Sequence, residues 1–170
     1  RVMSVFFWGY ATTQILGGSA ADLYGGDNTI IFSSFLWGLV CFLTPLLVYV
    51  SYLIFGQSQM MTFYTFILLR IIMGISQGIH FPSLSSILAV SIQDHMRSSA
   101  MSVICSGGLC GTLICGFFGS ILLEKTNWRI VFQIFGIFGM GFSYFLYVLS
   151  RDFRRKVRKS EKRIVSLNSL

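Results

Sequence analysis

The feature that most constrains this chain is a series of five long apolar segments separated by short polar breaks. A transmembrane helix needs about 20 mostly apolar residues to cross the hydrocarbon core of a bilayer. Membrane β-strands instead alternate apolar and polar residues over about ten positions, and these segments show no such alternation. The pattern therefore predicts an all-α transmembrane domain over residues 1–150, with five membrane-spanning helices at residues 4–21, 30–52, 61–91, 98–123 and 128–149.

Charged residues are scarce and unevenly placed. They make up 11% of the 170 residues, compared with about 25% in a soluble domain, so most of the surface is expected to face lipid. Eight of the 13 Lys and Arg residues lie between Arg151 and Arg163, after the last apolar segment. Such a cluster is typical of the cytosolic side of a membrane and can contact anionic lipid head groups. We therefore expect residues 151–170 to be a basic cytosolic tail or the start of a central loop, and we expect no nucleic-acid binding.

A cytosolic tail fixes the orientation of the five segments. Counting back from residue 151, the chain begins on the opposite side of the membrane. One additional helix upstream would give a six-helix unit with both ends in the cytosol, and transporters are commonly built from repeated units of this kind. The five helices are thus expected to form most of one six-helix half. Such a half needs the missing second half or a partner chain to enclose a site.

Arg70 is the strongest candidate for a functional residue. It lies about ten residues into the third apolar segment, which places it roughly 15 Å deep at 1.5 Å per residue. An arginine at that depth costs at least ~2.5–3.5 kcal/mol, so it is expected to face a cavity or a partner. All six acidic residues fall in the breaks or in the tail. Because guanidinium binds phosphate or carboxylate bidentately, Arg70 is predicted to bind an anionic small-molecule substrate, and structural pairing is the alternative.

Other polar residues accompany Arg70 at helical spacing. Gln77 and His80 lie on the same segment, and either could hydrogen-bond a substrate or make a contact between helices. In the first segment Tyr10 and Gln14 belong to a polar stripe, which is typical of a cavity wall. The predicted substrate-binding residues are therefore Tyr10, Gln14, Arg70, Gln77 and His80.

Small residues recur at four-residue steps in two segments. Gly74, Gly78 and Pro82 follow Arg70; the glycines leave room for a ligand or a neighbouring helix, and the proline can kink the helix. Gly107 begins a similar row in the fourth segment, which predicts close packing against another helix, either rigid or sliding.

Enzyme chemistry finds no support in the sequence. The chain has no paired-carboxylate site, no nucleophile–histidine–acid set and no phosphate-binding loop. Its four cysteines lie inside apolar segments without metal-ligand spacing. We therefore expect no catalytic residue, no metal site and no cofactor, which leaves binding and translocation.

Three motifs resemble signatures of the major facilitator superfamily. Residues 18–26 (GSAADLYGG) resemble its loop between the second and third helices, residues 70–78 (RxxxGxxxG) its fourth helix, and residues 128–136 (WRxxFxxxG) the start of its sixth. Their order places the five segments as helices two to six of the first half and implies transport by alternating access. Helix packing and gating are expected at Gly18, Asp22, Gly25, Gly26, Gly74, Gly78, Pro82, Arg97, Gly107 and Gly111.

A narrower resemblance is to the organic-anion and phosphate branch, solute carrier family 17. It rests on residues 6–18 (FFWGYxxTQxxGG) and on Gln77, because the vesicular nucleotide carriers of this branch have Gln where its glutamate and sialic acid carriers have Glu. The resemblance implies that Arg70 is the arginine needed for anion transport. It also implies uptake of ATP and other nucleotides into secretory vesicles or lysosomes, driven by membrane potential.

Several alternatives stay open at this stage. The substrate could be phosphate, glutamate or another organic anion, and the compartment could be the plasma membrane. The chain could also be a non-transporting, truncated membrane protein that pairs with a full-length partner.

Overall fold

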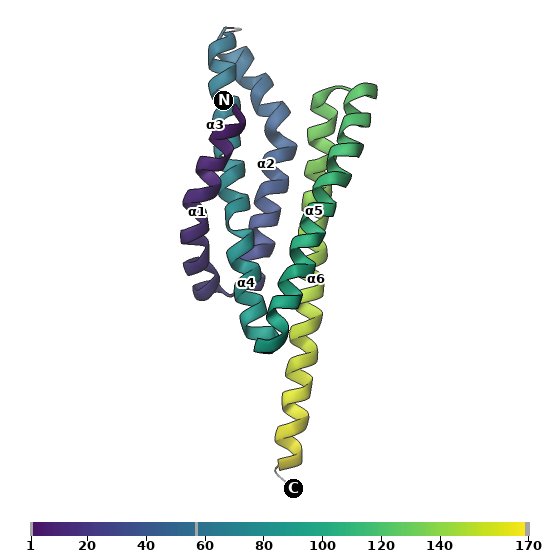
Figure 1. The fold of residues 1–170 in the computed structure, drawn as a ribbon. Helices are drawn as coiled ribbons and strands as arrows, with labels where there is room; N and C mark the ends of the chain where they lie inside the picture. Colours follow the sequence, from purple (N-terminus) through teal and green to yellow (C-terminus); the bar gives the residue numbers. More distant parts are fainter. Residues whose placement is uncertain (1, 57, 169–170) are drawn as a thin grey trace.

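The computed structural model describes residues 2–56 and 58–168, and every regular element in these ranges is an α-helix. The all-α prediction is therefore confirmed. The helices are α1 (Val2–Tyr24), α2 (Gly26–Ile54), α3 (Gln59–Gly78), α4 (His80–Ser91), α5 (Asp94–Lys125) and α6 (Trp128–Asn168). They coincide with the five predicted segments, except that the third segment forms two helices and the last helix continues into the basic tail (Figure 1).

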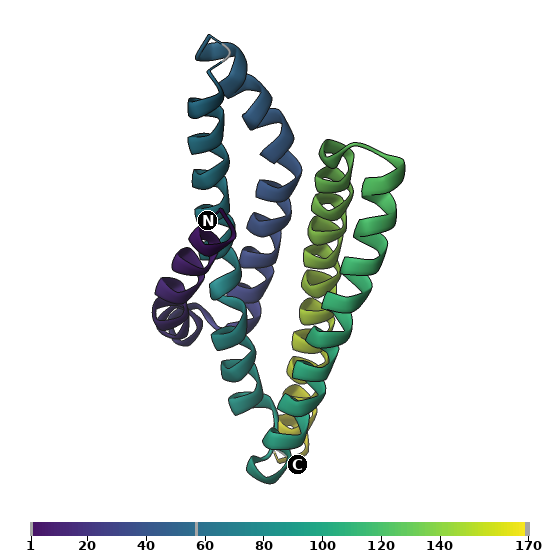
Figure 2. The same cartoon turned by 45° about the horizontal axis from the view of Figure 1, so that its top comes forward.

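The helices form two groups that meet along α2 and α6. In Figure 1, α1, α2 and α3 stand side by side, α4 continues α3, and α5 and α6 form a long hairpin beside them. The turned view in Figure 2 separates this hairpin from α1 and α3. The main packed pairs are α2 with α6 and α1 with α3, whereas α5 contacts only α4 and α6 within the described ranges.

Four stretches of helix are long and apolar enough to cross a membrane: Gly26–Ile54, Gln59–Ser91, Asp94–Lys125 and Trp128–Lys156. The 23-residue α1 is not among them, because Thr12, Thr13 and Gln14 interrupt its apolar sequence. This helix packs along the spanning α3. It therefore still occupies the position expected of the first transmembrane helix.

Burial in this molecule is the reverse of burial in a soluble protein. The largest fully buried side chains of the described residues are Ser33, Ser34, Ser76 and Ser83. Large apolar side chains lie outside instead: Ile15 is 82% exposed, Leu23 80% and Val90 87%. An extensive apolar exterior fits a lipid environment, where small buried residues let helices approach closely. The chain is an integral membrane protein.

The third predicted segment is broken at Ile79, between α3 and α4. The sequence predicts a kink from Pro82, and the break lies three residues before it. The proline has no N–H to donate to the carbonyl of Gly78, and its ring crowds that carbonyl. Ile79 keeps helical dihedral angles (φ −76°, ψ −20°) and accepts a hydrogen bond from the N–H of Ser83. The two helices therefore continue as one span across the break.

A single residue, Gly25, links α1 to α2 with a φ of +84°. Glycine adopts this left-handed conformation at little cost, whereas other residues do so rarely. The next residue packs on α4, because a Cβ on Gly26 would lie 2.8 Å from the carbonyl oxygen of Ser83. The predicted loop motif thus forms a tight turn fixed against α4.

Glycines also set the contact between α2 and α6. A Cβ on Gly136 would lie 2.5 Å from the backbone nitrogen of Phe42, and one on Gly38 would lie 2.6 Å from that of Met140. Close backbone approach of this kind drives helix association in lipid, where burial of apolar side chains contributes little. The α2–α6 contact therefore depends on the absence of side chains at these positions.

We predict that Gly136→Ala destabilises the fold by about 1–3 kcal/mol, the usual cost of overpacking, because the added methyl group meets the backbone of α2. Gly141→Ala is the matched control, since a Cβ on Gly141 has no neighbour within 4 Å and both changes add the same helix propensity. Thermal unfolding of the purified protein in mild detergent measures the difference. Equal unfolding temperatures would contradict the packing described.

Candidate functional site

Arg70 lies inside the α3–α4 span, eleven residues after Gln59, which corresponds to roughly 16 Å along the helix axis. Its guanidinium carbon lies 4.9 Å from the ring centre of Phe66 and 5.0 Å from that of Phe132. Cation–π attraction operates at these distances. Since the rings belong to α3 and α6, the arginine is held between these two helices.

The guanidinium of Arg70 has few protein partners. Within the described residues its one hydrogen bond runs from Nη1 to the Sδ of Met73, at 3.9 Å. The one ion pair in the same ranges joins Arg97 and Asp94, so no described carboxylate pairs with Arg70. Guanidinium carries five N–H donors, and a thioether is a weak acceptor. Most of the hydrogen-bonding capacity of this half-buried cation is therefore left for other groups.

The two rings that hold Arg70 also line a cavity of about 560 Å³ between α2, α3 and α6. The remaining lining residues are Val48, Tyr52, Gln59, Thr62, Phe63 and Trp128. Aromatic walls with few polar groups suit the planar or apolar part of a small molecule. The charge of Arg70 lies against the same two rings.

Gly74 and Gly78 lie against α1. A Cβ on Gly74 would contact the carbonyl oxygen of Phe6, and one on Gly78 would contact the side chain of Thr13 and the carbonyl of Tyr10. The space left by these glycines is therefore filled by a neighbouring helix, one of the two occupants that the sequence allows. Tyr10 also stacks on Phe6 at this contact, with ring centres 6.1 Å apart.

The predicted substrate-binding residues are distributed over several contacts. Arg70 contacts α6, Tyr10 lies at the contact of α1 with α3, and His80 contacts α2. Gln14 is exposed on α1, and Gln77 is half-buried on α3. The structure thus brings the aromatic rings of Phe66 and Phe132 to Arg70, rather than the other predicted residues.

His80 ties the α3–α4 break to α2. Its Nδ1 lies 3.1 Å from the hydroxyl of Ser33, and its Nε2 lies 2.9 Å from the hydroxyl of Ser34. The hydroxyl of Ser33 also lies 3.2 Å from the carbonyl of Ile30. Because a hydroxyl can donate or accept, each ring nitrogen of His80 has a partner in either tautomer. His80 is therefore a contact between helices.

The two serines are missed by sequence reasoning. They lie 47 and 46 residues before His80 in the chain, and nothing in their spacing indicates that they face it. One sequence feature could have indicated them, namely a pair of adjacent serines inside an apolar segment. A buried hydroxyl normally has a hydrogen-bond partner, so such a pair predicts a polar contact with another helix.

The predicted gating residues Asp22 and Arg97 lie near the ends of helices. Arg97 donates from Nε to the carbonyl of Ile92 at 3.0 Å and from Nη2 to the carbonyl of Ala89, and it pairs with Asp94 at 2.6 Å. Such carbonyls lack partners within the helix, so Arg97 stabilises the α4–α5 turn. Asp22 lines a cavity of about 660 Å³ beside the α1–α2 turn. A gating role for either residue stays a prediction.

Most of the glycine row on α5 has no neighbour in the described ranges. A Cβ on Gly107 or Gly111 would meet nothing within 4 Å, and Gly119 is the one buried residue of this helix. The same holds for Gly18 on α1. Close packing at these three positions stays a prediction and requires a helix other than those described.

Comparison with known proteins places this arrangement in a family. The model of the Major Facilitator Superfamily matches residues 2–169, which include all six helices. The chain belongs to the major facilitator superfamily. The three motifs that resemble this superfamily all lie within the matched residues.

Curated relatives within the superfamily are more specific. The chain is 38% identical over 146 residues to the voltage-gated purine nucleotide uniporter SLC17A9 of Rattus norvegicus, and 37% identical over 146 residues to that of Homo sapiens. It is 30% identical over 138 residues to the chloroplastic ascorbate transporter of Arabidopsis thaliana. These matches cover 86%, 86% and 81% of the chain. The resemblance to solute carrier family 17 is confirmed.

The chain is much shorter than these superfamily members. It spans 31% of the rat protein, 32% of the human protein and 24% of the Arabidopsis protein. The matched region therefore corresponds to a third or less of the length of each of these relatives.

We predict that Ser34→Ala destabilises the protein by about 1–3 kcal/mol, because it leaves the part-buried Nε2 of His80 without this partner. In a His80→Ala background the same change is expected to cost much less, since the unsatisfied nitrogen is already absent. A double-mutant cycle on thermal unfolding measures this coupling. Ser106→Ala on exposed α5, whose hydroxyl bonds only to its own helix, is the control. Equal costs of Ser34→Ala in both backgrounds would refute the contact.

Proposed function

We propose that this chain is part of a transporter that moves organic anions across a membrane by alternating access, with Arg70 as the anion-binding residue. The observation that carries the proposal is the guanidinium of Arg70, held within a spanning helix by two aromatic rings, without a carboxylate partner among the described residues.

The chemistry of Arg70 favours an anionic ligand. A cation inside the membrane is stable only where water, a counter-ion or a ligand compensates its charge. Phe66 and Phe132 orient the guanidinium from their faces, which leaves its N–H groups in the guanidinium plane for hydrogen bonds. Phosphate and carboxylate oxygens match this planar set of donors. An anion that binds and leaves would supply the missing charge during each cycle.

Nucleotides are the substrate class that we propose. The relatives with 37–38% identity carry the name purine nucleotide uniporter, and Gln77 matches the nucleotide carriers of the branch. A nucleotide also combines the two features of the site, since its phosphates suit Arg70 and its planar base suits aromatic walls. The cavity of about 560 Å³ lies within the size range of small-molecule sites, roughly 300–1,000 Å³.

Membrane potential is the proposed driving force. Gln77 cannot take up or release a proton, so this position offers no proton coupling. Moving one elementary charge through 100 mV is worth about 2.3 kcal/mol, and a nucleotide with several negative charges gains a multiple of that value. Uptake into an inside-positive compartment such as a secretory vesicle or a lysosome follows, and the longer carrier supplies the second half that closes the site.

We predict that nucleotide uptake depends on Arg70. Labelled ATP uptake is measured in liposomes that contain the longest natural form of this protein, under an inside-positive potential. Arg70→Ala is expected to lower uptake by roughly 10- to 150-fold, equivalent to the ~1.5–3 kcal/mol of hydrogen bonds to a charged group. Arg70→Lys keeps the charge but loses the bidentate geometry. Its uptake rate is therefore expected to lie between those of the original protein and Arg70→Ala.

Arg129→Ala is the matched control, because the guanidinium of Arg129 also lies over two aromatic rings, Tyr49 and Trp128, at the start of α6. It should leave uptake near the original level. Unlabelled glutamate and phosphate are offered as competitors, and a pH gradient replaces the potential in a parallel series. Inhibition of ATP uptake by glutamate or phosphate would indicate that the natural substrate is another anion. Absence of uptake by a correctly folded protein would contradict the transport proposal itself and favour a non-transporting role.

A further inference from the structure

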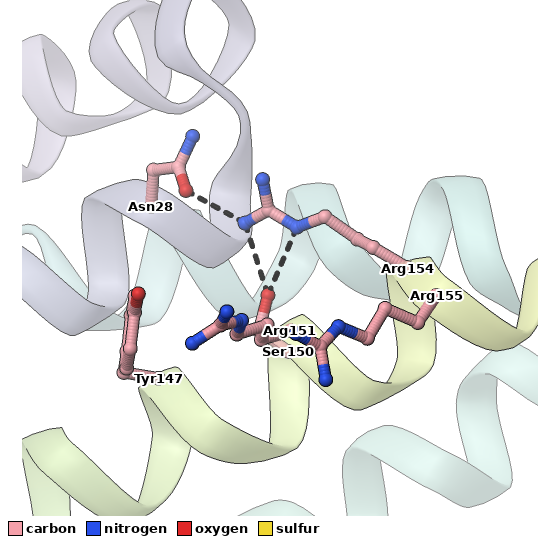
Figure 3. Close-up of a pocket in the computed structure, with 6 residues that line it drawn as sticks. All are labelled: Asn28, Tyr147, Ser150, Arg151, Arg154 and Arg155. Atoms are coloured by element: carbon pink, nitrogen blue, oxygen red, sulfur yellow. Dashed lines mark hydrogen bonds between the residues drawn. The ribbon is translucent and has the colours of Figure 1, made fainter. Parts of the chain in front are cut away.

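The basic end of α6 forms a second cationic cavity, which the proposed transport does not use. It has a volume of about 490 Å³ and lies between the start of α2 and the second half of α6. Its lining residues are Asn28, Tyr147, Ser150, Arg151, Arg154 and Arg155. Figure 3 shows Arg154 directed across to Asn28, whereas Arg151 and Arg155 lie beside Ser150 on the α6 side.

Hydrogen bonds of Arg154 fix the walls of this cavity. Its Nη2 donates to the Oδ1 of Asn28 at 2.6 Å and to the hydroxyl of Ser150 at 2.9 Å, and its Nε donates to the same hydroxyl at 3.1 Å. Asn28 lies in the first turn of α2. The arginine therefore links α2 to α6 through a residue that lies 126 positions before it in the chain. The cavity walls are held together by these hydrogen bonds.

The other two arginines carry charge that no described group neutralises. Arg151 and Arg155 are exposed and lie four residues apart, which places them on the same face of α6. Neither has a hydrogen bond or an ion pair with the side chains that the structure describes. No carboxylate lines the cavity. Asp27, outside the lining, accepts a hydrogen bond from Ser150 at 3.4 Å.

The position of the cavity along α6 indicates which part of the bilayer lies beside it. Arg151 follows Trp128, the first residue of α6, by 23 residues, a rise of roughly 35 Å along the helix. The hydrocarbon core is about 30 Å thick, so the cavity lies at the level of the lipid head groups. Tyr147 lines the cavity and Tyr144 is 69% exposed, and tyrosines at this level are typical of the membrane interface.

We propose that this cavity binds the phosphate group of an anionic phospholipid in the leaflet at the basic end of α6. The guanidinium groups of Arg151 and Arg155 supply paired donors that match phosphate oxygens, and the hydroxyl of Tyr147 can add another. A neighbouring groove lined by Phe32, Phe35 and Tyr144 shares Asn28 and Tyr147 with the cavity, and it offers an apolar surface for the acyl chains. This inference rests on the cavity alone and is independent of the transported substrate.

Lipid binding to the purified full-length protein in neutral detergent tests the proposal. Native mass spectrometry measures the affinity for phosphatidylserine and, separately, for phosphatidylcholine. The original protein is expected to prefer phosphatidylserine. The double change Arg151→Gln/Arg155→Gln should weaken phosphatidylserine binding by about 30-fold, or about 5-fold for each basic residue at the surface. Arg154 is left intact because it links the helices.

Two further variants keep the test decisive. Lys125→Gln/Arg129→Gln removes the same charge near the opposite end of α6 and should retain the preference for phosphatidylserine. Arg151→Lys/Arg155→Lys keeps the charge and should lose only a few-fold in affinity, which separates binding from misfolding. Equal affinity for both lipids, or equal losses in the two glutamine variants, would overturn the proposal. Displacement of the lipid by equal concentrations of inorganic phosphate would also overturn it, since the site would then bind free anions.

Discussion

Close approach of helix backbones is the constraint on which this structure depends. In lipid the burial of apolar side chains does little to hold helices together, so association relies on packing and on hydrogen bonds between helices. Glycines supply the first at the α2–α6 and α1–α3 contacts. Buried serines supply the second, as at the bond from Ser143 to the carbonyl of Ile31, 2.8 Å long. The large apolar side chains are left to face the membrane, as their exposure shows.

Three polar sites of this membrane domain differ in how far the protein itself satisfies their hydrogen-bonding groups. His80 has a partner for each ring nitrogen, so it serves the fold. Arg154 has its bonds to Asn28 and Ser150 and leaves its neighbours Arg151 and Arg155 free at the level of the head groups. Arg70 alone lies deep within a span with aromatic faces and one weak hydrogen bond. A half-buried cation whose donors are largely unused by the described residues is the arrangement that an anion carrier requires.

Much of the fold was predictable because hydropathy acts locally. The positions of the spans, the membrane location and the depth of Arg70 follow from the residues of each segment alone. The rotation of each helix about its axis does not, and this rotation decides whether Gly74 and Gly78 face a ligand or α1. The same reason hides the serine partners of His80 and the contact of Asn28 with Arg154, which join residues far apart in the chain. The break at Ile79 was predictable only in part. Pro82 predicts a kink, but the break lies in the turn before the proline.

The most direct measurement of the central claim is a structure of the longest natural form of this protein bound to ATP, determined by electron cryomicroscopy. The account predicts phosphate density within about 3 Å of the guanidinium of Arg70, the length of a charge-assisted hydrogen bond, with the base against aromatic side chains. Nucleotide density elsewhere, with Arg70 paired to a carboxylate of the second half, would contradict it. Arg70 would then be a structural residue, and the anion site would have to be sought on other helices.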